Sequence, residues 1–332
     1  MKLYKVLKIN LKSLLGYFMV SIITKLSFIT VNKIFFKQRI DNFLIKKFKK
    51  IPKSKLYKII RKGYIRINKK RVQAKYKLKL GDLIRIPPLK INSNIKKKNL
   101  NIKNKKILLK KILYEDKILL IINKPAGISV HGGSGINFNI IDSLRILRPH
   151  EKYLELIHRL DRYTSGILMI AKKRSSLRYF HKEFRKHCIQ KKYLALVHRK
   201  CLFQKKIVDS PLLKINVVNK KKMVSVNKIG KKSKTIFYTK KRNLLYSLVS
   251  IIPYTGRTHQ IRVHAAFLKH PIIFDNRYGN NNLDKKIQTK KINKILLLHA
   301  EKITFVHPIL KKKITICAPL QKNFKNAIKH LF

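Results

Sequence analysis

The sequence predicts an α+β protein with a small N-terminal module of two helices and a strand ribbon, followed by a larger domain on a mainly antiparallel mixed sheet. Its 332 residues correspond to about two domains. In the larger part, short apolar runs alternate with turn residues, and helical periodicity is confined to a few segments. A Lys/Asn-rich stretch without glycine or aromatic residues separates the two parts and has the composition of a tether. We therefore divide the chain into an N-terminal extension (1–37), the small module (38–88), a linker (89–110) and the larger domain (111–332).

The N-terminal extension contains the only segment that suggests a membrane. Residues 13–24 carry no charge and follow four lysines, an order similar to that of a secretory signal. The run is too short to span a bilayer, no small-x-small cleavage site follows it, and Lys25 comes directly after it. We expect a cytoplasmic protein without a membrane anchor, and Met19 is an alternative start of translation.

The small module begins with two helical patterns. The first covers 41–48, and the second covers 53–62 with Leu56, Ile59 and Ile60 on one face. After Gly63, residues 64–68 alternate as a strand, and a last strand over 83–86 ends at two prolines. The outer face of the second helix is cationic and is our candidate surface for binding a nucleic-acid backbone, formed by Lys53, Lys55, Lys58, Arg61 and Lys62.

The larger domain combines expected strands and helices. We expect strands at 118–122, 167–171, 193–197 and 246–252, and helices at 140–147, 175–188 and 261–268. A second Lys-rich insert, 280–294, is expected to be a surface loop.

The net charge restricts the partners. Lysine and arginine total 81 against 13 acidic residues, a formal net charge of +68. Such a chain repels itself unless polyanions are nearby, so a phosphate backbone is the first candidate partner and anionic lipid the second. Part of the lysine excess can also reflect an AT-rich genome. The three scattered cysteines give neither a disulfide framework nor paired zinc ligands, and they indicate a reducing compartment.

One acidic residue lies in a distinctive motif. Asp161 belongs to the segment His158–Gly166, with Arg159 and Arg162 on either side, just before an apolar run. Nearby arginines lower the pKa of a carboxyl group, so we expect a permanent anion at neutral pH, suited to a nucleophile or a base. A structural Arg–Asp pair at a strand entrance would produce the same pattern.

A second motif, 254–264, contains two histidines and two arginines. On a helix, Arg262 follows Thr258 by four residues and His259 by three, while Ile261 and Ala265 form a packing pair. Arg262 is therefore a candidate partner for a distant carboxylate. A phosphate-binding face and a satisfied core network are the alternatives.

Other chemistries do not fit the residues. The histidines show no metal-ligand spacing with acids, and the glycine-rich segment 132–135 lacks the Lys-Ser/Thr of a phosphate-binding loop. The kinase-like tetrapeptide 158–161 lacks the other kinase motifs, and no second acid lies close enough in sequence to suggest a glycosidase. A single carboxylate without a metal or nucleotide site is what the residues indicate.

With these residues the chain resembles the RluA-type pseudouridine synthases, whose motif His-Arg-Leu-Asp-x-x-Thr-Ser-Gly is met in full by residues 158–166. The N-terminal block, opened by Arg39, is similar to the αL RNA-binding module of the S-four type. Residues 130–135 and 145–149 most resemble the RluC branch, which modifies bacterial large-subunit ribosomal RNA. Further segments resemble family motifs in family order: 123–127, 191–195, 256–264, 275–279 and 298–300.

The resemblance implies an isomerase that converts specific uridines of 23S ribosomal RNA, or its precursor particles, to pseudouridine without cofactor or metal. Asp161 would be the catalytic residue and Arg262 the cation that pairs with it. Tyr193 would stack on the flipped uracil, and Leu298 would form an apolar wall. Arg159 would fill the gap left by the base or hold backbone phosphate.

Two questions stay open at this point. Asp161 could attack the ribose or abstract a sugar proton. The chain could also be a non-catalytic RNA-binding or ribosome-assembly protein that retains the fold, although the intact Asp161, Tyr193 and Arg262 favour the enzyme. We expect a monomer.

Overall fold

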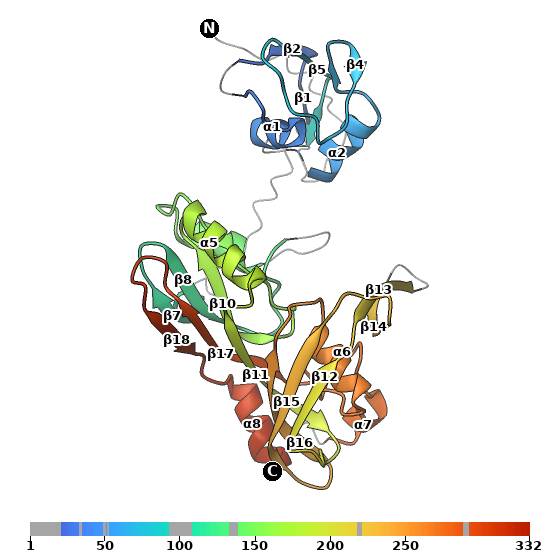
Figure 1. The fold of residues 1–332 in the computed structure, drawn as a ribbon, viewed down its shortest axis with the longest axis vertical. Helices are drawn as coiled ribbons and strands as arrows, with labels where there is room; N and C mark the ends of the chain where they lie inside the picture. The colour runs from blue at the N-terminus through green and yellow to red at the C-terminus, as the bar shows by residue number, and fades with distance from the viewer. Residues whose placement is uncertain are drawn as a thin grey trace, which may run out of the picture. The chain divides into compact units, whose positions relative to one another are not determined.

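The computed structural model describes residues 21–32, 35–48, 51, 53–92, 108–132, 139–217, 221–287 and 292–332. These residues form two compact units, one within Met1–Lys98 and the other within Asn99–Phe332, each with its own hydrophobic core (Figure 1). The apolar stretch before residue 21 and most of the expected linker lie outside the described residues. No described helix is long and apolar enough to cross a membrane.

The first unit contains the two expected helices beside a four-stranded sheet. Leu56, Ile59 and Ile60 of the second helix are buried in the core of the unit, as their spacing predicts. The helices are α1 (Ile40–Lys47) and α2 (Lys53–Arg61), and the sheet has the order β2 (Ser27–Thr30), β5 (Leu83–Ile86), β3 (Arg66–Ile67), β4 (Lys70–Arg71).

The N-terminal segment contributes more to this unit than the sequence indicated. Strand β2, which we assigned to an extension, pairs antiparallel with β5 from Ser27 opposite Ile86 to Thr30 opposite Leu83. A further pair joins β1 (Ser21–Ile23) to β6 (Lys90–Asn92). Without β2, the backbone N–H and C=O groups along one edge of β5 would be unpaired. The pairing with β2 satisfies these groups.

The second unit is built on a large mixed sheet, in agreement with the expected α+β class. Its path runs β12–β15–β16–β11–β17–β10–β8–β7, with β18 paired to β17 and β9 to β10. Among the described strands of this sheet, only β10 and β17 pair in parallel. The strands are β7 (Ile112–Glu115), β8 (Leu119–Lys124), β9 (Glu155–Leu156), β10 (Ser165–Ala171), β11 (Gln190–His198), β12 (Lys205–Asp209), β15 (Lys234–Arg242), β16 (Tyr246–Pro253), β17 (Leu298–Val306) and β18 (Lys313–Cys317).

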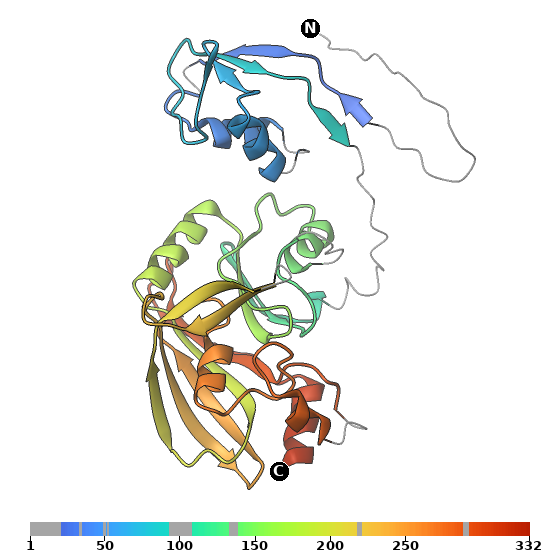
Figure 2. The same ribbon diagram turned by 90° about the vertical axis from the view of Figure 1, so that its right-hand side faces the viewer.

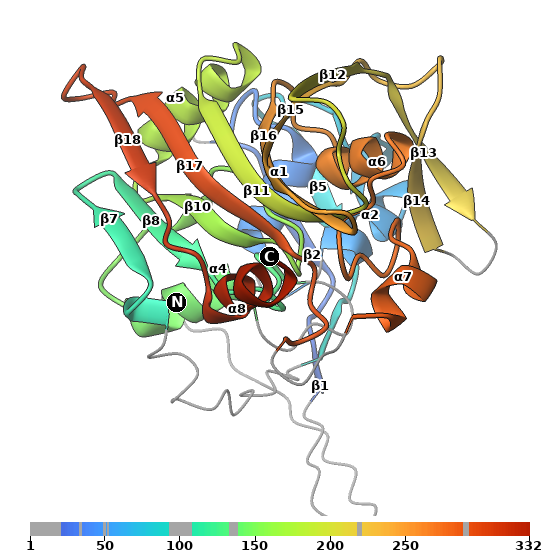
Figure 3. The same cartoon turned by 90° about the horizontal axis from the view of Figure 1, so that it is seen from below.

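Helices cover both faces of the half that contains β11 and β16. Ala195 and Val197 of β11 pack in one cluster with Ala265 of α6, whereas Leu196 packs in another with Phe324 of α8. Adjacent strand residues point to opposite faces, so α6 and α8 lie on different sides of the strand. Figure 3 shows both helices from below. The helices of this unit are α4 (Ile140–Leu147), α5 (Arg174–Arg185), α6 (Gln260–Phe267), α7 (Asn281–Lys285) and α8 (Lys322–Leu331), and a separate hairpin consists of β13 (Leu212–Val217) and β14 (Lys221–Val226) (Figure 2).

The Lys-rich insert 280–294 is not simply a surface loop, so that expectation was wrong in part. It contains α7, and its Ile287 and Ile292 are buried against Phe324 and Leu331 of α8. His198 Nε2 lies 2.7 Å from Asp284 Oδ1 and ties the insert to β11. The sequence did not reveal this packing, because the two isoleucines are isolated among lysines and show no helical or strand periodicity.

Candidate active site

Asp161 lies in the loop that leads into β10, at the centre of the sheet. The loop closes by a hydrogen bond from the Thr164 amide to the Asp161 carbonyl (3.2 Å). A Cβ on Gly166 would lie 2.2 Å from the Ala300 carbonyl oxygen, and Gly166 has φ of 105°. Only glycine allows this close approach. The motif glycine therefore lets β10 pair with β17 and places Asp161 beside the start of β17.

A buried lysine anchors the same loop from behind. Lys124 is fully buried, and its Nζ donates to the carbonyls of Pro125, Ile128 and Arg162 at 2.7–3.0 Å. The Gly127 amide also donates to the Arg162 carbonyl (2.9 Å). Burial lowers the pKa of Lys124 to about 7, and the negative charge of Asp161 opposes that shift. The segment 123–127 thus holds the loop that contains Asp161 in place, a role that its motif alone did not reveal.

Arg262, on α6, lies between two carboxylates. Its Nη1 donates to Asp161 Oδ2 at 3.0 Å. Its Nε and Nη2 both donate to Asp275, at 2.7 Å each, in a bidentate pair. The sequence proposed Arg262 as the partner of a distant carboxylate, and the structure brings Asp161 to it across 101 residues of chain.

Asp275 is the partner that the sequence analysis missed. Its side chain is 1% exposed. Burial by itself would raise the pKa of Asp275, but the hydrogen bonds and charge of Arg262, with the amides of Arg277 and Tyr278, hold that pKa below its usual range. Asp275 therefore stays ionised and fixes the guanidinium that contacts Asp161. The motif 275–279 was the available signal, since its acid precedes a tight turn.

The expected aromatic ring and apolar wall lie on the strands next to the loop. Tyr193 of β11 is half-buried at the junction of two core clusters and pairs in register with Ala300 of β17. Burial and the nearby charge of Asp161 raise the pKa of the Tyr193 hydroxyl, which keeps it neutral. Leu298 is buried at the start of β17, opposite Ala195. The structure therefore brings Tyr193 and Leu298 to neighbouring strands beside Asp161.

The remaining expected residues are on the surface. Arg159 is exposed and forms no ion pair with the described residues. Lys58 and Arg61 of α2 and Lys62, which directly follows the helix, are exposed. Lys62 Nζ lies 5.9 Å from the Tyr64 ring centroid. Lys55 is half-buried, and the side chain of Lys53 lies outside the described residues.

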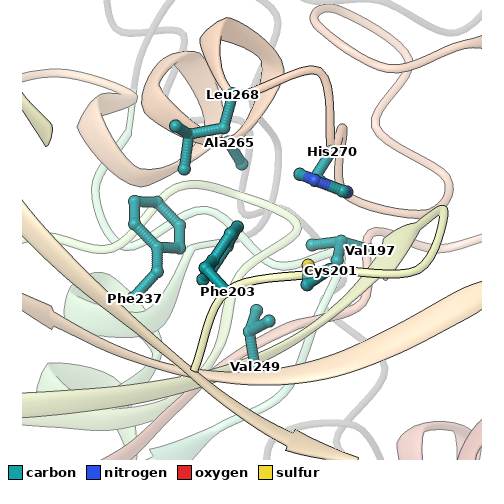
Figure 4. A pocket seen from close by; sticks show the side chains of 8 residues that line it. All are labelled: Val197, Cys201, Phe203, Phe237, Val249, Ala265, Leu268 and His270. Carbon is teal, nitrogen blue, oxygen red and sulfur yellow. The ribbon is translucent and has the colours of Figure 1, made fainter. Parts of the chain in front are cut away.

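A small apolar hollow between α6 and the sheet is separate from this site (Figure 4). Side chains of the hydrophobic core line the hollow, and none of the expected site residues is among them. The hollow is a packing gap beneath α6, and its lining residues are Val197, Cys201, Phe203, Phe237, Val249, Ala265, Leu268 and His270.

The described residues contain no group of three or more His, Cys, Asp or Glu side chains that could hold a metal ion. The arrangement around Asp161 is a carboxylate held by one cation, next to a half-buried aromatic ring and an apolar wall. A planar base can stack on such a ring while the carboxylate acts on its sugar.

Two family models match the chain. The model described as RNA pseudouridylate synthase matches residues 118–267, and the S4 domain model matches residues 38–84. Among solved structures, the chain is similar to human RNA pseudouridylate synthase domain containing 4, with a TM-score of 0.56 and 26% identity, over 69% of this chain and 95% of that one.

Bacterial relatives are similar over nearly the whole chain. "Ribosomal large subunit pseudouridine synthase C" of Buchnera aphidicola subsp. Schizaphis graminum is 54% identical over 93% of this chain and 98% of its own length. The proteins with the same name from Haemophilus influenzae and Vibrio cholerae are each 46% identical, over 89% and 92% of this chain and 91% and 96% of their own lengths.

Proposed function

The chain belongs to the RNA pseudouridylate synthase family and is an isomerase that acts on RNA, and we propose that it modifies specific uridines of bacterial large-subunit ribosomal RNA. The names of its bacterial relatives support this substrate. The observation that carries the proposal is the position of Asp161, held at one oxygen by Arg262 beside Tyr193 and Leu298. A non-catalytic role is not favoured, because this arrangement is intact.

The reaction conserves all atoms of the nucleotide. The bond between ribose C1′ and uracil N1 breaks, the base turns, and a bond forms between C1′ and C5. The proton on C5 leaves, and N1 ends with a proton. Neither a redox step nor a transferred group is involved, which supports our proposal that no cofactor is needed.

Asp161 is proposed to perform the chemistry through the oxygen that Arg262 does not hold. Of the two carboxylate oxygens of Asp161, only Oδ2 accepts a hydrogen bond from a described residue, and the donor is Arg262. Oδ1 is therefore available to attack the ribose or to remove a sugar proton. Tyr193 is proposed to stack on the extruded uracil against Leu298, and Arg159, exposed beside the loop, to fill the vacated stack or hold phosphate.

The first unit is proposed to bind the RNA backbone. Its match to the S4 domain model and the exposed cations of α2 support this role. We also propose that the protein acts as a monomer. We propose that the protein acts in the cytoplasm, where bacterial ribosomal RNA is accessible.

The catalytic assignment is tested by Asp161→Ala and Asp161→Asn. With RNA that carries tritium at uridine C5, we expect tritium release to be abolished in both variants and RNA binding to be nearly unchanged. Asp209→Ala is the matched control, because Asp209 is an exposed acid whose nearest cation, Lys234, is 3.5 Å away. Tritium release by Asp161→Ala at the wild-type rate would show that Asp161 is not catalytic.

The substrate is tested in cells that lack the protein. We expect pseudouridines to disappear from large-subunit ribosomal RNA and to return when the wild-type protein, but not Asp161→Ala, is restored. Loss of pseudouridine only from transfer RNA or small-subunit RNA would refute the proposed substrate.

A further inference from the structure

A chain of polar contacts leads from the β13–β14 hairpin to Asp161. The Val224 amide on β14 donates to the Tyr278 hydroxyl at 3.1 Å. That hydroxyl lies 2.8 Å from His259 Nδ1, and His259 Nε2 lies 3.7 Å from Asp161 Oδ2. His259 is 14% exposed, and Tyr278 packs against a small apolar cluster formed by the hairpin and α6. Neither His259 nor Tyr278 has a role in the function proposed above.

The contacts admit one arrangement in which the hydroxyl proton of Tyr278 has an acceptor. A backbone amide can only donate, so the Tyr278 oxygen accepts from Val224. Among the described residues, His259 Nδ1 is the only acceptor within reach of the Tyr278 hydroxyl proton. Nδ1 of a neutral imidazole that accepts a hydrogen bond leaves the proton on Nε2. In this arrangement His259 presents an N–H to Asp161.

His259 is held in this place by an unusual backbone conformation. Its φ of 54° and ψ of 18° lie in the left-handed region, which non-glycine residues rarely adopt. Gln260 fixes the turn from the other side. Its Oε1 accepts from the Arg257 amide (3.0 Å), and its Nε2 donates to the Lys234 carbonyl (3.0 Å). The fold thus stabilises a strained residue next to the catalytic carboxylate.

We propose that His259 is a positioning residue for Asp161. Its neutral imidazole, oriented by Tyr278, directs Nε2–H at Oδ2 and, with Arg262, keeps that oxygen occupied so that Oδ1 faces the substrate. The distance of 3.7 Å is too long for a hydrogen bond in the free protein, and a shift of roughly 1 Å on RNA binding closes it. This inference rests on the proposed role of Asp161.

The charged groups around His259 agree with a neutral ring. Burial is the main cause that lowers the pKa of His259. The cations Arg262 and Arg277 lower it further, and the carboxylates Asp161 and Asp275 oppose them. The hydroxyl of Tyr278 faces Nδ1 and is also neutral, since burial raises its pKa.

The test compares two substitutions at His259. Glutamine places an amide N–H near the position of Nε2, whereas alanine places nothing there. We expect His259→Ala to lower kcat for tritium release about 10- to 100-fold, the factor that corresponds to a lost hydrogen bond to a charged group. We expect KM and the affinity for RNA to change little, and His259→Gln to restore most of kcat. His187→Ala is the matched control, because His187 is exposed and also has a positive φ.

Tyr278 gives an independent readout. Without its hydroxyl, the imidazole can place its proton on Nδ1 and turn a lone pair toward Asp161. Tyr278→Phe should therefore lower kcat in the wild-type background but have little effect on kcat in the His259→Gln background, because glutamine has no such tautomer. Such non-additivity is the signature of the contact chain.

The outcomes separate this inference from the proposed function. Wild-type kcat in His259→Ala, or equal loss in His259→Ala and His259→Gln, would overturn the positioning role while Asp161→Ala still abolishes activity. Equal effects of Tyr278→Phe in both backgrounds would also overturn it. Activity in Asp161→Ala would instead refute the proposed function.

Discussion

Replacement of Asp275 by asparagine should destabilise the second unit, because Asp275 neutralises the charge of Arg262 at a buried position. The pair has two contacts of 2.7 Å, and the side chains are 1% and 9% exposed. Removal of one partner from a buried ion pair costs about 3–5 kcal/mol. Asparagine can still accept from the Arg277 and Tyr278 amides, and Arg262 keeps its contact with Asp161. We therefore expect a loss near the lower limit, about 3 kcal/mol.

That loss is measurable by calorimetry. For a domain of this size each kcal/mol shifts Tm by about 2–4 °C, so Asp275→Asn should melt about 6–12 °C below the wild type. The folded-state pKa of Asp275 is lowered, so its contribution is present above the unfolded-state pKa and is lost as the pH falls through the folded value. The difference in Tm should therefore be constant from about pH 5 to 8 and shrink below about pH 4. The control is Asp209→Asn, whose side chain is 63% exposed. A Tm within 1 °C or so of the wild type for Asp275→Asn would refute this reasoning.

Three further predictions concern other parts of the chain. Gly166→Ala should give little soluble protein, since its Cβ would lie 2.2 Å from a backbone oxygen, whereas Gly81→Ala, with a similar positive φ but open space around it, should fold with a small loss of Tm. The His158 imidazole should not titrate by NMR until near pH 4, because burial lowers its pKa to about 4. The unfolded chain binds this proton from about pH 6.5, so this group reduces stability as the pH falls from 6.5 to 4. Titration of His158 near pH 6.5 in the folded protein would contradict its burial. Finally, glutamine should replace three exposed cations together: Lys58, Arg61 and Lys62. The slope of log affinity for ribosomal RNA against log salt concentration should then become shallower by about 2–3. An unchanged slope would exclude these residues from the RNA interface.

Local patterns in the sequence were enough to identify several elements. Helix α4 spans the residues that periodicity predicts, and α2 differs by one residue at its end. Such elements depend on apolar spacing and turn residues within a few positions of one another, which a single sequence displays directly. The strand pairing of β2 was not visible in this way, because it depends on an edge more than fifty residues further along the chain.

The site divides in the same manner. The motif 158–166 indicated Asp161 as the candidate catalytic acid. The helical spacing made Arg262 a candidate partner for a distant carboxylate. Only the tertiary structure decided that Arg262 has two such partners and that Asp275 is the more buried one. It also decided that His259 lies near Asp161, that Tyr278 contacts His259, and that Lys124 anchors the loop of Asp161. The sequence by itself indicated the first candidates for the chemistry, Asp161, Tyr193 and Arg262, because reactivity depends on residue type. Their protonation and orientation were decided by burial and by contacts between distant segments, because desolvation and hydrogen-bond direction exist only once the chain has folded.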